Sequence, residues 1–226
     1  MLLSKTVSEI EQLLKNHQTS LGSHLKDGIA LSQKIDALLG YQISTIEDSL
    51  SPPLEAGRSE PGAWLGLKPD VLQSTYSEFY DLLTDSRFAH HSHWVDLGAA
   101  YGRLGTLIGL LKPRLRFSGF EFIDARAQEG RRIYESLQLK NQMLFTQDIC
   151  DCSFFMPQAD FYFMYDFGPR AKVEGVLQKL QLVAHEKPIT VVARGRGTQH
   201  WIDTSQPWLS QVKTPDRRPT YSIYFS

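Results

Sequence analysis

Apolar residues recur at helical spacing through the first forty residues of the chain. The run Thr6–Glu9 fits a capping box, in which a threonine and a glutamate three residues later close the start of a helix. Ile10, Leu13 and Leu14 follow it at helical spacing. A second helix is predicted over residues 25–39. Its imperfect apolar stripe consists of Ile29, Leu31, Ile35, Leu38 and Leu39.

The helical pattern is then interrupted by SLSPPLEAGRSEPGAW, residues 49–64, where prolines, glycines and serines gather. Such punctuation predicts a linker or an irregular surface loop. We therefore expect a boundary near residue 60, with an N-terminal helical extension over residues 1–60 and a main domain over residues 61–226. KPDVLQSTYSEFYDLL, residues 68–83, is predicted to form a helix, or a turn followed by a helix, with proline in its first turn.

Beyond this helix, five short β-like runs alternate with segments of helical length. The runs are HWVDLG (93–98), RFSGFEF (116–122), QMLFTQDI (142–149), DFYFMYDF (160–167) and PITVVARG (188–195). The clearest intervening helices are Arg103–Leu111, Asp124–Leu137 and Arg170–Ala184. Apolar strands that alternate with helices predict a parallel sheet covered on both faces.

Two further runs, WLSQVKT (208–214) and TYSIYF (220–225), are separated only by PDRRP. This short spacer predicts an antiparallel hairpin at one edge of the sheet. The predicted fold is therefore α/β: a seven-stranded, mostly parallel, Rossmann-like sheet with an antiparallel C-terminal hairpin, preceded by N-terminal helices.

A glycine-rich turn, VDLGAAYGRL (95–104), follows the first strand, where doubly wound sheets bind their ligands. The dinucleotide fingerprint would require glycine at positions 100 and 103, which hold alanine and arginine, and no P-loop is present. The pattern that fits is acid-x-Gly-x-Gly-x-Gly, with Asp96, Gly98, Ala100 and Gly102. Alanine at the middle position is expected to be tolerated if its φ angle is negative.

Acidic residues also mark the ends of the next two strands. Glu121 ends the second strand, where a carboxylate can accept hydrogen bonds from both hydroxyls of a ribose, and Phe122 beside it is a further candidate for ligand contact. Asp148 follows the third strand and can accept an adenine amino proton, with Ile149 as an apolar support for the ring. Three acids at successive strand ends favour a cationic ligand that carries no phosphate.

Three segments together resemble the class I S-adenosylmethionine-dependent methyltransferases over roughly residues 60–226. Within that class, the chain is similar to the non-SET lysine methyltransferases (the disruptor-of-telomeric-silencing family) and their bacterial relatives. The first segment is LKPDVLQSTYSEF, in which Thr75, Tyr76 and Glu78 match the family and Ser77 replaces the usual glycine. The others are VDLGAAYGRLG and MYDFGP, with Asp166 where the family prefers asparagine.

The resemblance implies a role for each matched segment. Thr75, Tyr76, Glu78 and the turn after the first strand would hold the amino-acid end of S-adenosylmethionine, and no metal is required. YDFG would form the floor of the acceptor pocket. There, Asp166 would accept a proton or hydrogen bond from an incoming ammonium, and the rings of Tyr165 and Phe167 would stabilise its charge. The alternatives are ordinary packing for both rings, and for Asp166 an N-cap of the helix near Pro169.

The net charge and the composition limit the kinds of molecule that the protein is expected to bind. The 226 residues carry a formal net charge of -1, whereas proteins that bind nucleic acid by neutralising phosphates are usually far more basic. The sequence predicts no membrane span and no secretory signal. The two cysteines, Cys150 and Cys152, are expected to be reduced thiols in a cytoplasmic protein. His90, His91 and His93 are expected in a solvated loop rather than at a metal site.

Three functions remain open at this point. The first is a methyltransferase that acts on a protein side chain, with lysine as the candidate acceptor. The second is the same chemistry on a small molecule or a nucleic-acid base. The third is a non-catalytic binding module on a degenerate methyltransferase fold. The sequence leaves the acceptor, the oligomeric state and the role of the N-terminal helices open.

Overall fold

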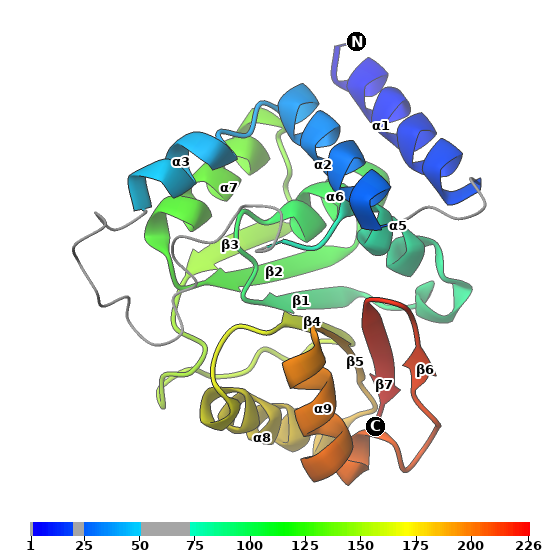
Figure 1. The fold of residues 1–226 in the computed structure, drawn as a ribbon, viewed down its shortest axis with the longest axis vertical. Helices are drawn as coiled ribbons and strands as arrows, with labels where there is room; N and C mark the ends of the chain where they lie inside the picture. Colours follow the sequence, from blue (N-terminus) through cyan, green and yellow to red (C-terminus); the bar gives the residue numbers. More distant parts are fainter. Residues whose placement is uncertain (1, 20–24, 51–72) are drawn as a thin grey trace.

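A seven-stranded sheet lies at the centre of the computed structural model, which describes residues 2–19, 25–50 and 73–226 (Figure 1). The strand order is β3-β2-β1-β4-β5-β7-β6. The strands are β1 (His93–Leu97), β2 (Arg116–Glu121), β3 (Gln142–Thr146), β4 (Phe161–Tyr165), β5 (Thr190–Arg194), β6 (Asp216–Arg217) and β7 (Tyr221–Phe225). β1 to β5 are parallel, whereas β7 pairs antiparallel with both β5 and β6. The predicted fold is confirmed.

Helices cover both faces of this sheet (Figure 1). One face carries α1 (Leu2–Thr19), α2 (Leu25–Leu39), α3 (Ile43–Leu50), α5 (Tyr76–Thr84), α6 (Arg103–Leu111) and α7 (Asp124–Ser136); the other carries α8 (Arg170–Glu186) and α9 (Arg196–Ser205). Side chains of each strand point alternately to the two faces. In β4, Phe161 and Phe163 join the core beneath the first group, and Tyr162 and Met164 join the core beneath the second.

The N-terminal helices share the first of these cores. Ile10 and Leu14 of α1, and Ile35 of α2, are buried in the same apolar cluster as residues of the sheet, including Trp94 and Phe163. Apolar burial of this kind is the main stabilising contribution of a surface helix. The predicted boundary near residue 60 itself falls outside the described residues.

The parallel strands bring the expected ligand-binding ends together. Leu97 of β1 pairs with Phe120 of β2, and Phe120 pairs in turn with Phe145 of β3. Because neighbouring parallel strands end at the same edge, the turns after β1, β2 and β3 lie side by side. This edge is where open α/β sheets bind ligands.

One predicted helix start is wrong. The capping box proposed for Thr6–Glu9 lies inside α1, which begins at Leu2. The second helix does span Leu25–Leu39. The start predicted at Pro69 lies outside the described residues, and α5 has Thr75 as its N-cap.

Two helices were missed. α3 is only eight residues long, and its buried residues are Ile43 and Glu47. α9 buries only Thr198 and Ile202, so its apolar stripe is too short for sequence patterning to detect.

The C-terminal pairing differs from the predicted hairpin. WLSQVKT does not form the partner strand; instead β6 consists of Asp216 and Arg217, inside the segment expected to be the turn. Leu209 is fully buried in the second core and is the last residue of a short 3₁₀ helix that begins at Pro207. Packing of this leucine into the core holds the run away from the sheet edge.

The histidine-rich segment also differs from the expectation. His93 is not in a solvated loop: it belongs to β1, is 5% exposed, and its Nε2 lies 2.9 Å from the hydroxyl of Ser118. Its ring is therefore a satisfied, buried group. Among the residues that the structure describes, no three His, Cys, Asp or Glu side chains are grouped so as to hold a metal ion.

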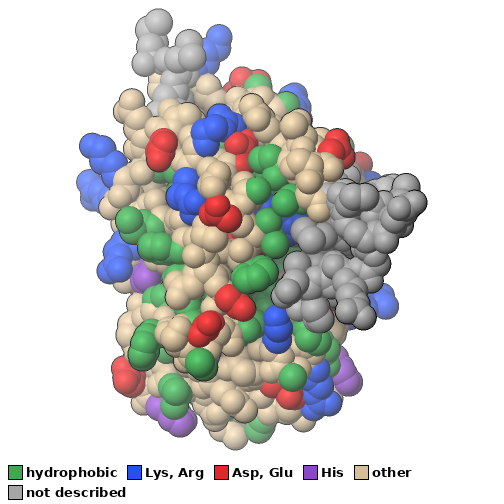
Figure 2. Space-filling model, turned by 90° about the vertical axis from the view of Figure 1, so that its left-hand side faces the viewer, with side chains coloured by type: hydrophobic (Ala, Val, Ile, Leu, Met, Phe, Trp, Pro, Cys, Tyr) green, Lys and Arg blue, Asp and Glu red, His purple; other side chains and the backbone are tan. Residues whose placement is uncertain are grey.

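The molecular surface carries both signs of charge. On the face shown in Figure 2, acidic and basic side chains are intermixed rather than separated by sign. Within the described part of the chain, no helix combines the length and apolar character needed to cross a membrane.

Candidate functional site

The turn after β1 takes left-handed backbone angles at three alternate positions. The φ angles are 91° at Gly98, 45° at Ala100 and 71° at Gly102. The expectation of a negative φ at Ala100 is therefore wrong. A left-handed alanine costs about 1–2 kcal/mol relative to its preferred conformation, so surrounding contacts must hold it in place.

Those contacts come first from the neighbouring strand. The amides of Gly98 and Ala99 both donate to the carbonyl of Phe120 at 2.9 Å. At Gly102 an added Cβ would lie 2.5 Å from the hydroxyl of Tyr134, so glycine is required there by packing as well as by φ. The turn leads directly into α6, for which Gly102 is the N-cap.

Glu121 ties this turn to the end of β2. One carboxylate oxygen accepts the amide proton of Ala100 and the other accepts that of Ile123, both at 2.8 Å. Glu121 is 6% exposed, and burial raises the pKa of its carboxyl. Each oxygen keeps a further lone pair. The predicted ribose-binding residue is thus held rigidly and can still accept hydrogen bonds.

A group of buried polar side chains without partners lies beside the turn. Both amide atoms of Gln73 and the hydroxyl of Ser74 are buried and have no hydrogen-bond partner. With Asp96, they line a cavity of about 20 Å³. Buried polar groups are nearly always satisfied in folded proteins, so these donors and acceptors are available to a polar partner. The cavity itself has room for about one water molecule.

Asp96 adds a carboxyl group to the same cavity. It lies in β1 and is 4% exposed. Burial raises its pKa to about 8, and the nearby negative charge of Glu121 adds to the shift. Asp96 and Glu121 are therefore close enough for their charges to interact.

Gln73 and Ser74 were missed by the sequence analysis, although Thr75, Tyr76 and Glu78 directly follow them. Thr75 and Glu78 form a capping box: the Glu78 amide donates to the Thr75 hydroxyl at 3.3 Å, and the Thr75 amide donates to the Glu78 carboxylate at 2.8 Å. The capping box is visible in the sequence and marks Thr75 as the start of a helix. It could therefore have indicated that Gln73 and Ser74 lie on the loop before that helix.

Tyr76 and Glu78 occupy positions that differ from those implied by the resemblance. Tyr76 is fully buried, and its hydroxyl donates to Asp36 of α2 at 3.1 Å. The Glu78 carboxylate, besides its capping contacts, accepts a hydrogen bond from Nε of Arg194 at 3.1 Å. Both side chains therefore support the loop from behind rather than lining the small cavity.

The candidate adenine-binding residues lie past β2 and β3. The amide of Gln147 donates to the carbonyl of Glu121 at 2.8 Å, which places this loop next to the end of β2. Asp148 is half-buried and accepts the amide proton of Cys150 at 2.8 Å. Ile149 is buried in the second core, whereas Phe122 is 51% exposed.

The segment after β4 is used differently from the predicted acceptor floor. Asp166 accepts hydrogen bonds from the backbone amide of Thr198 at 2.8 Å and from its hydroxyl at 2.7 Å. It thus contacts the first turn of α9, an interaction that the sequence did not indicate. Phe167 packs against Gly98: a Cβ added to Gly98 would lie 3.3 Å from the Cβ of Phe167.

Tyr165 lines the small cavity, but one face of its ring is already covered. The guanidinium of Arg194 lies 4.2 Å from the ring centroid. Arg194 thus occupies the position over the Tyr165 ring that was proposed for an incoming ammonium. A substrate cation would have to contact another part of the ring or bind at another site.

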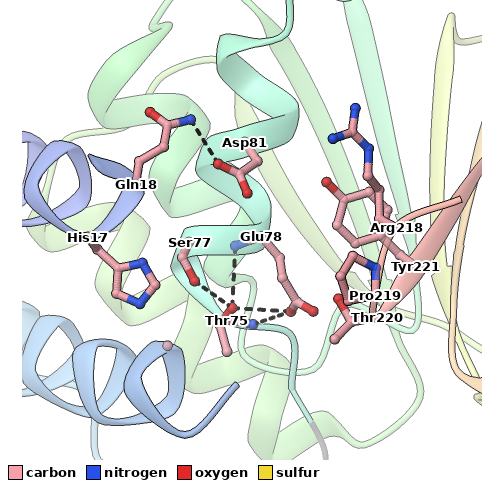
Figure 3. Close-up of a pocket in the computed structure, with 11 residues that line it drawn as sticks. His17, Gln18, Thr75, Ser77, Glu78, Asp81, Arg218, Pro219, Thr220 and Tyr221 are labelled. Carbon is pink, nitrogen blue, oxygen red and sulfur yellow. Dashed lines mark hydrogen bonds between the residues drawn. The ribbon is translucent and has the colours of Figure 1, made fainter. Parts of the chain in front are cut away.

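A second, larger cavity of about 450 Å³ lies on the other side of the start of α5 (Figure 3). It is lined by residues of α1, α2, α5 and the segment that enters β7: His17, Gln18, Gly28, Thr75, Ser77, Glu78, Asp81, Arg218, Pro219, Thr220 and Tyr221. Tyr221 pairs with Arg194 at the carboxyl end of β5. The cavity therefore opens at the ligand-binding edge of the sheet.

Comparison with known proteins supports the fold. Neither the scan against protein-family models nor the search of curated proteins found a match. Among solved structures, TrmN from Thermus thermophilus is 12% identical with a TM-score of 0.52, over 67% of this chain and 48% of that chain. An O-methyltransferase from neocarzinostatin biosynthesis, solved with S-adenosylmethionine and 2-hydroxy-5-methyl naphthoic acid, is 15% identical with a TM-score of 0.46, over 66% and 54%.

The chain thus spans about half of the length of these two structures. The likeness concerns the fold, since sequence identity is low. The seven-stranded sheet with an antiparallel C-terminal strand and flanking helices is the Rossmann-like fold of class I methyltransferases.

The left-handed alanine gives a direct prediction. Replacing Ala100 with glycine removes backbone strain of about 1–2 kcal/mol but adds about 0.4–1 kcal/mol of chain entropy in the unfolded state. We expect Ala100→Gly to raise the free energy of unfolding by up to about 1 kcal/mol in urea denaturation. A clear loss of stability would show that Ala100 does not hold the positive φ angle.

Proposed function

We propose that this protein is an S-adenosylmethionine-dependent methyltransferase. The observation that carries the proposal is the pair of unpartnered side chains, Gln73 and Ser74, which line a cavity with Asp96 beside the left-handed turn. Glu121 is fixed at the next strand end. This arrangement lies at the edge of the sheet where the fold binds ligands. It offers acidic and neutral polar groups and no phosphate-binding loop, which suits a cationic nucleoside.

The residues present fit the two polar ends of this cofactor. The Gln73 amide and the Ser74 hydroxyl supply donors and acceptors for the amino-acid end, and Asp96 supplies a negative charge for its ammonium. The remaining lone pairs of Glu121 would accept the ribose hydroxyls. Asp148, Ile149 and Phe122, which follow the neighbouring strands, would contact the adenine. Thr75, Tyr76 and Glu78 would act by holding the Gln73–Ser74 loop.

When bound, the cofactor supplies an activated methyl group on a sulfonium, which an in-line nucleophile can displace without a metal. The protein's task is to bind and orient both partners and to exclude water. The turn around Ala100 is suited to orientation because it is fixed by Glu121 on one side and by Phe120 on the other. Tyr165 and Phe167 would close the site from the end of β4.

We further propose a protein lysine side chain as the acceptor, with the larger cavity as its entry. Two carboxylates, Glu78 and Asp81, line this cavity, and Asp81 accepts a hydrogen bond from Gln18 at 2.8 Å (Figure 3). Carboxylates favour the approach of an ammonium group. Asp166, which follows β4, would accept a hydrogen bond or a proton from the incoming amine.

The main proposal predicts that Glu121 controls cofactor affinity. A carboxylate hydrogen bond contributes about 1.5–3 kcal/mol, so Glu121→Gln should weaken S-adenosylmethionine binding roughly tenfold or more in isothermal titration calorimetry. Glu135→Gln, on the exposed face of α7, is the matched control and should bind as the wild type does. Equal affinity in all three proteins, or no binding to the wild type, would contradict the proposal.

Asp96 predicts a pH dependence of binding. Its pKa near 8 means that the free protein holds a proton there at neutral pH, and a cationic ligand must expel that proton to gain the charge interaction. Affinity for S-adenosylmethionine should therefore rise as the pH rises from 6 to 7.5, by at most about tenfold per unit. Asp96→Asn should abolish this rise, because asparagine does not titrate. Glu121 and Arg103, which lie near Asp96, are unchanged in both proteins.

The acceptor proposal predicts a separate effect at Asp81. With radiolabelled S-adenosylmethionine and poly-L-lysine, Asp81→Asn should lower methyl transfer several-fold while cofactor affinity stays at the wild-type value. Asp48→Asn, an exposed aspartate on α3, should leave both unchanged. Label that enters nucleic-acid or metabolite fractions, and not poly-L-lysine or protein, would rule out lysine as the acceptor.

A further inference from the structure

The half of the turn that leads into α6 is held by side chains from the N-terminal helices. Arg103, the first residue of α6, forms an ion pair with Asp36 of α2, and its Nε donates to Asp36 at 3.1 Å. Arg103 is 6% exposed and Asp36 is 8% exposed. The same guanidinium donates to the carbonyl of Ser74 at 3.3 Å. One buried pair therefore connects α2 to both walls of the small cavity.

A second buried pair comes from α3. The carboxylate of Glu47 accepts hydrogen bonds from Nε and Nη2 of Arg126 in α7, at 2.7 and 2.9 Å. The same carboxylate accepts the hydroxyl proton of Tyr101, the residue after Ala100, at 2.7 Å. Tyr101 is fully buried and Glu47 is 4% exposed. Glu47 thus fixes the turn after β1 against the helix that follows Glu121.

The segment between α2 and α3 adds a backbone contact. The hydroxyl of Tyr41 donates to the carbonyl of Tyr101 at 3.2 Å and lies 2.7 Å from the hydroxyl of Thr106. Tyr101, the residue after the strained Ala100, is consequently held at two places. Tyr41 binds its backbone carbonyl and Glu47 binds its side-chain hydroxyl.

We propose that α2 and α3 belong to the cofactor site, with Asp36 and Glu47 as positioning residues that keep the Ala100–Arg103 turn in its binding shape. This inference rests on the proposed function. Buried ion pairs contribute little net stability compared with apolar packing, because both charges lose their hydration. Their placement on the turn therefore favours a role in fixing its geometry.

A nearby contact of the same kind does not touch the turn and supplies a matched control. Glu129 of α7 is buried, accepts the amide proton of Gln42 at 2.7 Å, and pairs with Arg132 at 2.7 Å. Arg132 in turn donates to the carbonyl of Gly40 at 2.6 Å. This group also joins the N-terminal helices to α7. Its loss should loosen the backbone on either side of Tyr41 while the bonds of Glu47 and Asp36 to the turn remain.

The test compares Glu47→Gln with Glu129→Gln in the full chain, by S-adenosylmethionine calorimetry and by thermal unfolding. We expect Glu47→Gln to weaken cofactor binding at least tenfold and Glu129→Gln by less than twofold, although both lower the melting temperature. Wild-type affinity in Glu47→Gln, or an equal loss in both variants, would overturn the inference while leaving the proposed function intact. Failure of the wild type to bind would overturn both.

Tyr101→Phe keeps the inference testable if Glu47→Gln does not fold. This variant removes only the hydroxyl and leaves the pair between Glu47 and Arg126 intact. We expect several-fold weaker cofactor binding, together with faster amide hydrogen exchange at residues 100–102. Unchanged affinity and unchanged exchange would show that Glu47 does not act through the turn.

Discussion

The carboxylate of Glu121 makes the contact on which the site depends. It bridges the amide of Ala100, in the turn after β1, and the amide of Ile123, at the start of the helix after β2. Together with the bonds from Gly98 and Ala99 to the carbonyl of Phe120, this contact joins the two elements beyond the end of the sheet. The bridge holds an alanine in a left-handed conformation, and it places a buried acid within electrostatic reach of Asp96. Without it, the turn and the polar cavity beside it would lose their common support.

The central sheet was predictable because its strands are short apolar runs separated by helices with clear stripes. The expected bounds of α6 agree with the structure, and those of α7 and α8 agree to within two residues. The short helices α3 and α9 were not predicted, because each buries only two residues. The hairpin was misplaced because Leu209 resembles a strand residue in sequence but packs into the core below the sheet.

The site could be predicted only in part, for similar reasons. The motif acid-x-Gly-x-Gly-x-Gly located the turn, and the end of the second predicted strand singled out Glu121. Both signals depend on local spacing along the chain. Gln73 and Ser74 carry no such motif, and their significance lies in being buried without partners, which only three-dimensional packing reveals. Asp166 and Tyr165 were assigned to an acceptor, but Thr198 and Arg194 already contact them. Contacts between segments so distant in sequence leave no local pattern.

The account is tested most directly by a crystal structure of the full chain with S-adenosylhomocysteine. It predicts the ribose hydroxyls on Glu121 and the amino-acid end against Gln73, Ser74 and Asp96, with the Ala100 φ angle still positive. A ligand bound elsewhere, or one that leaves Gln73 and Ser74 without partners, would contradict the central claim.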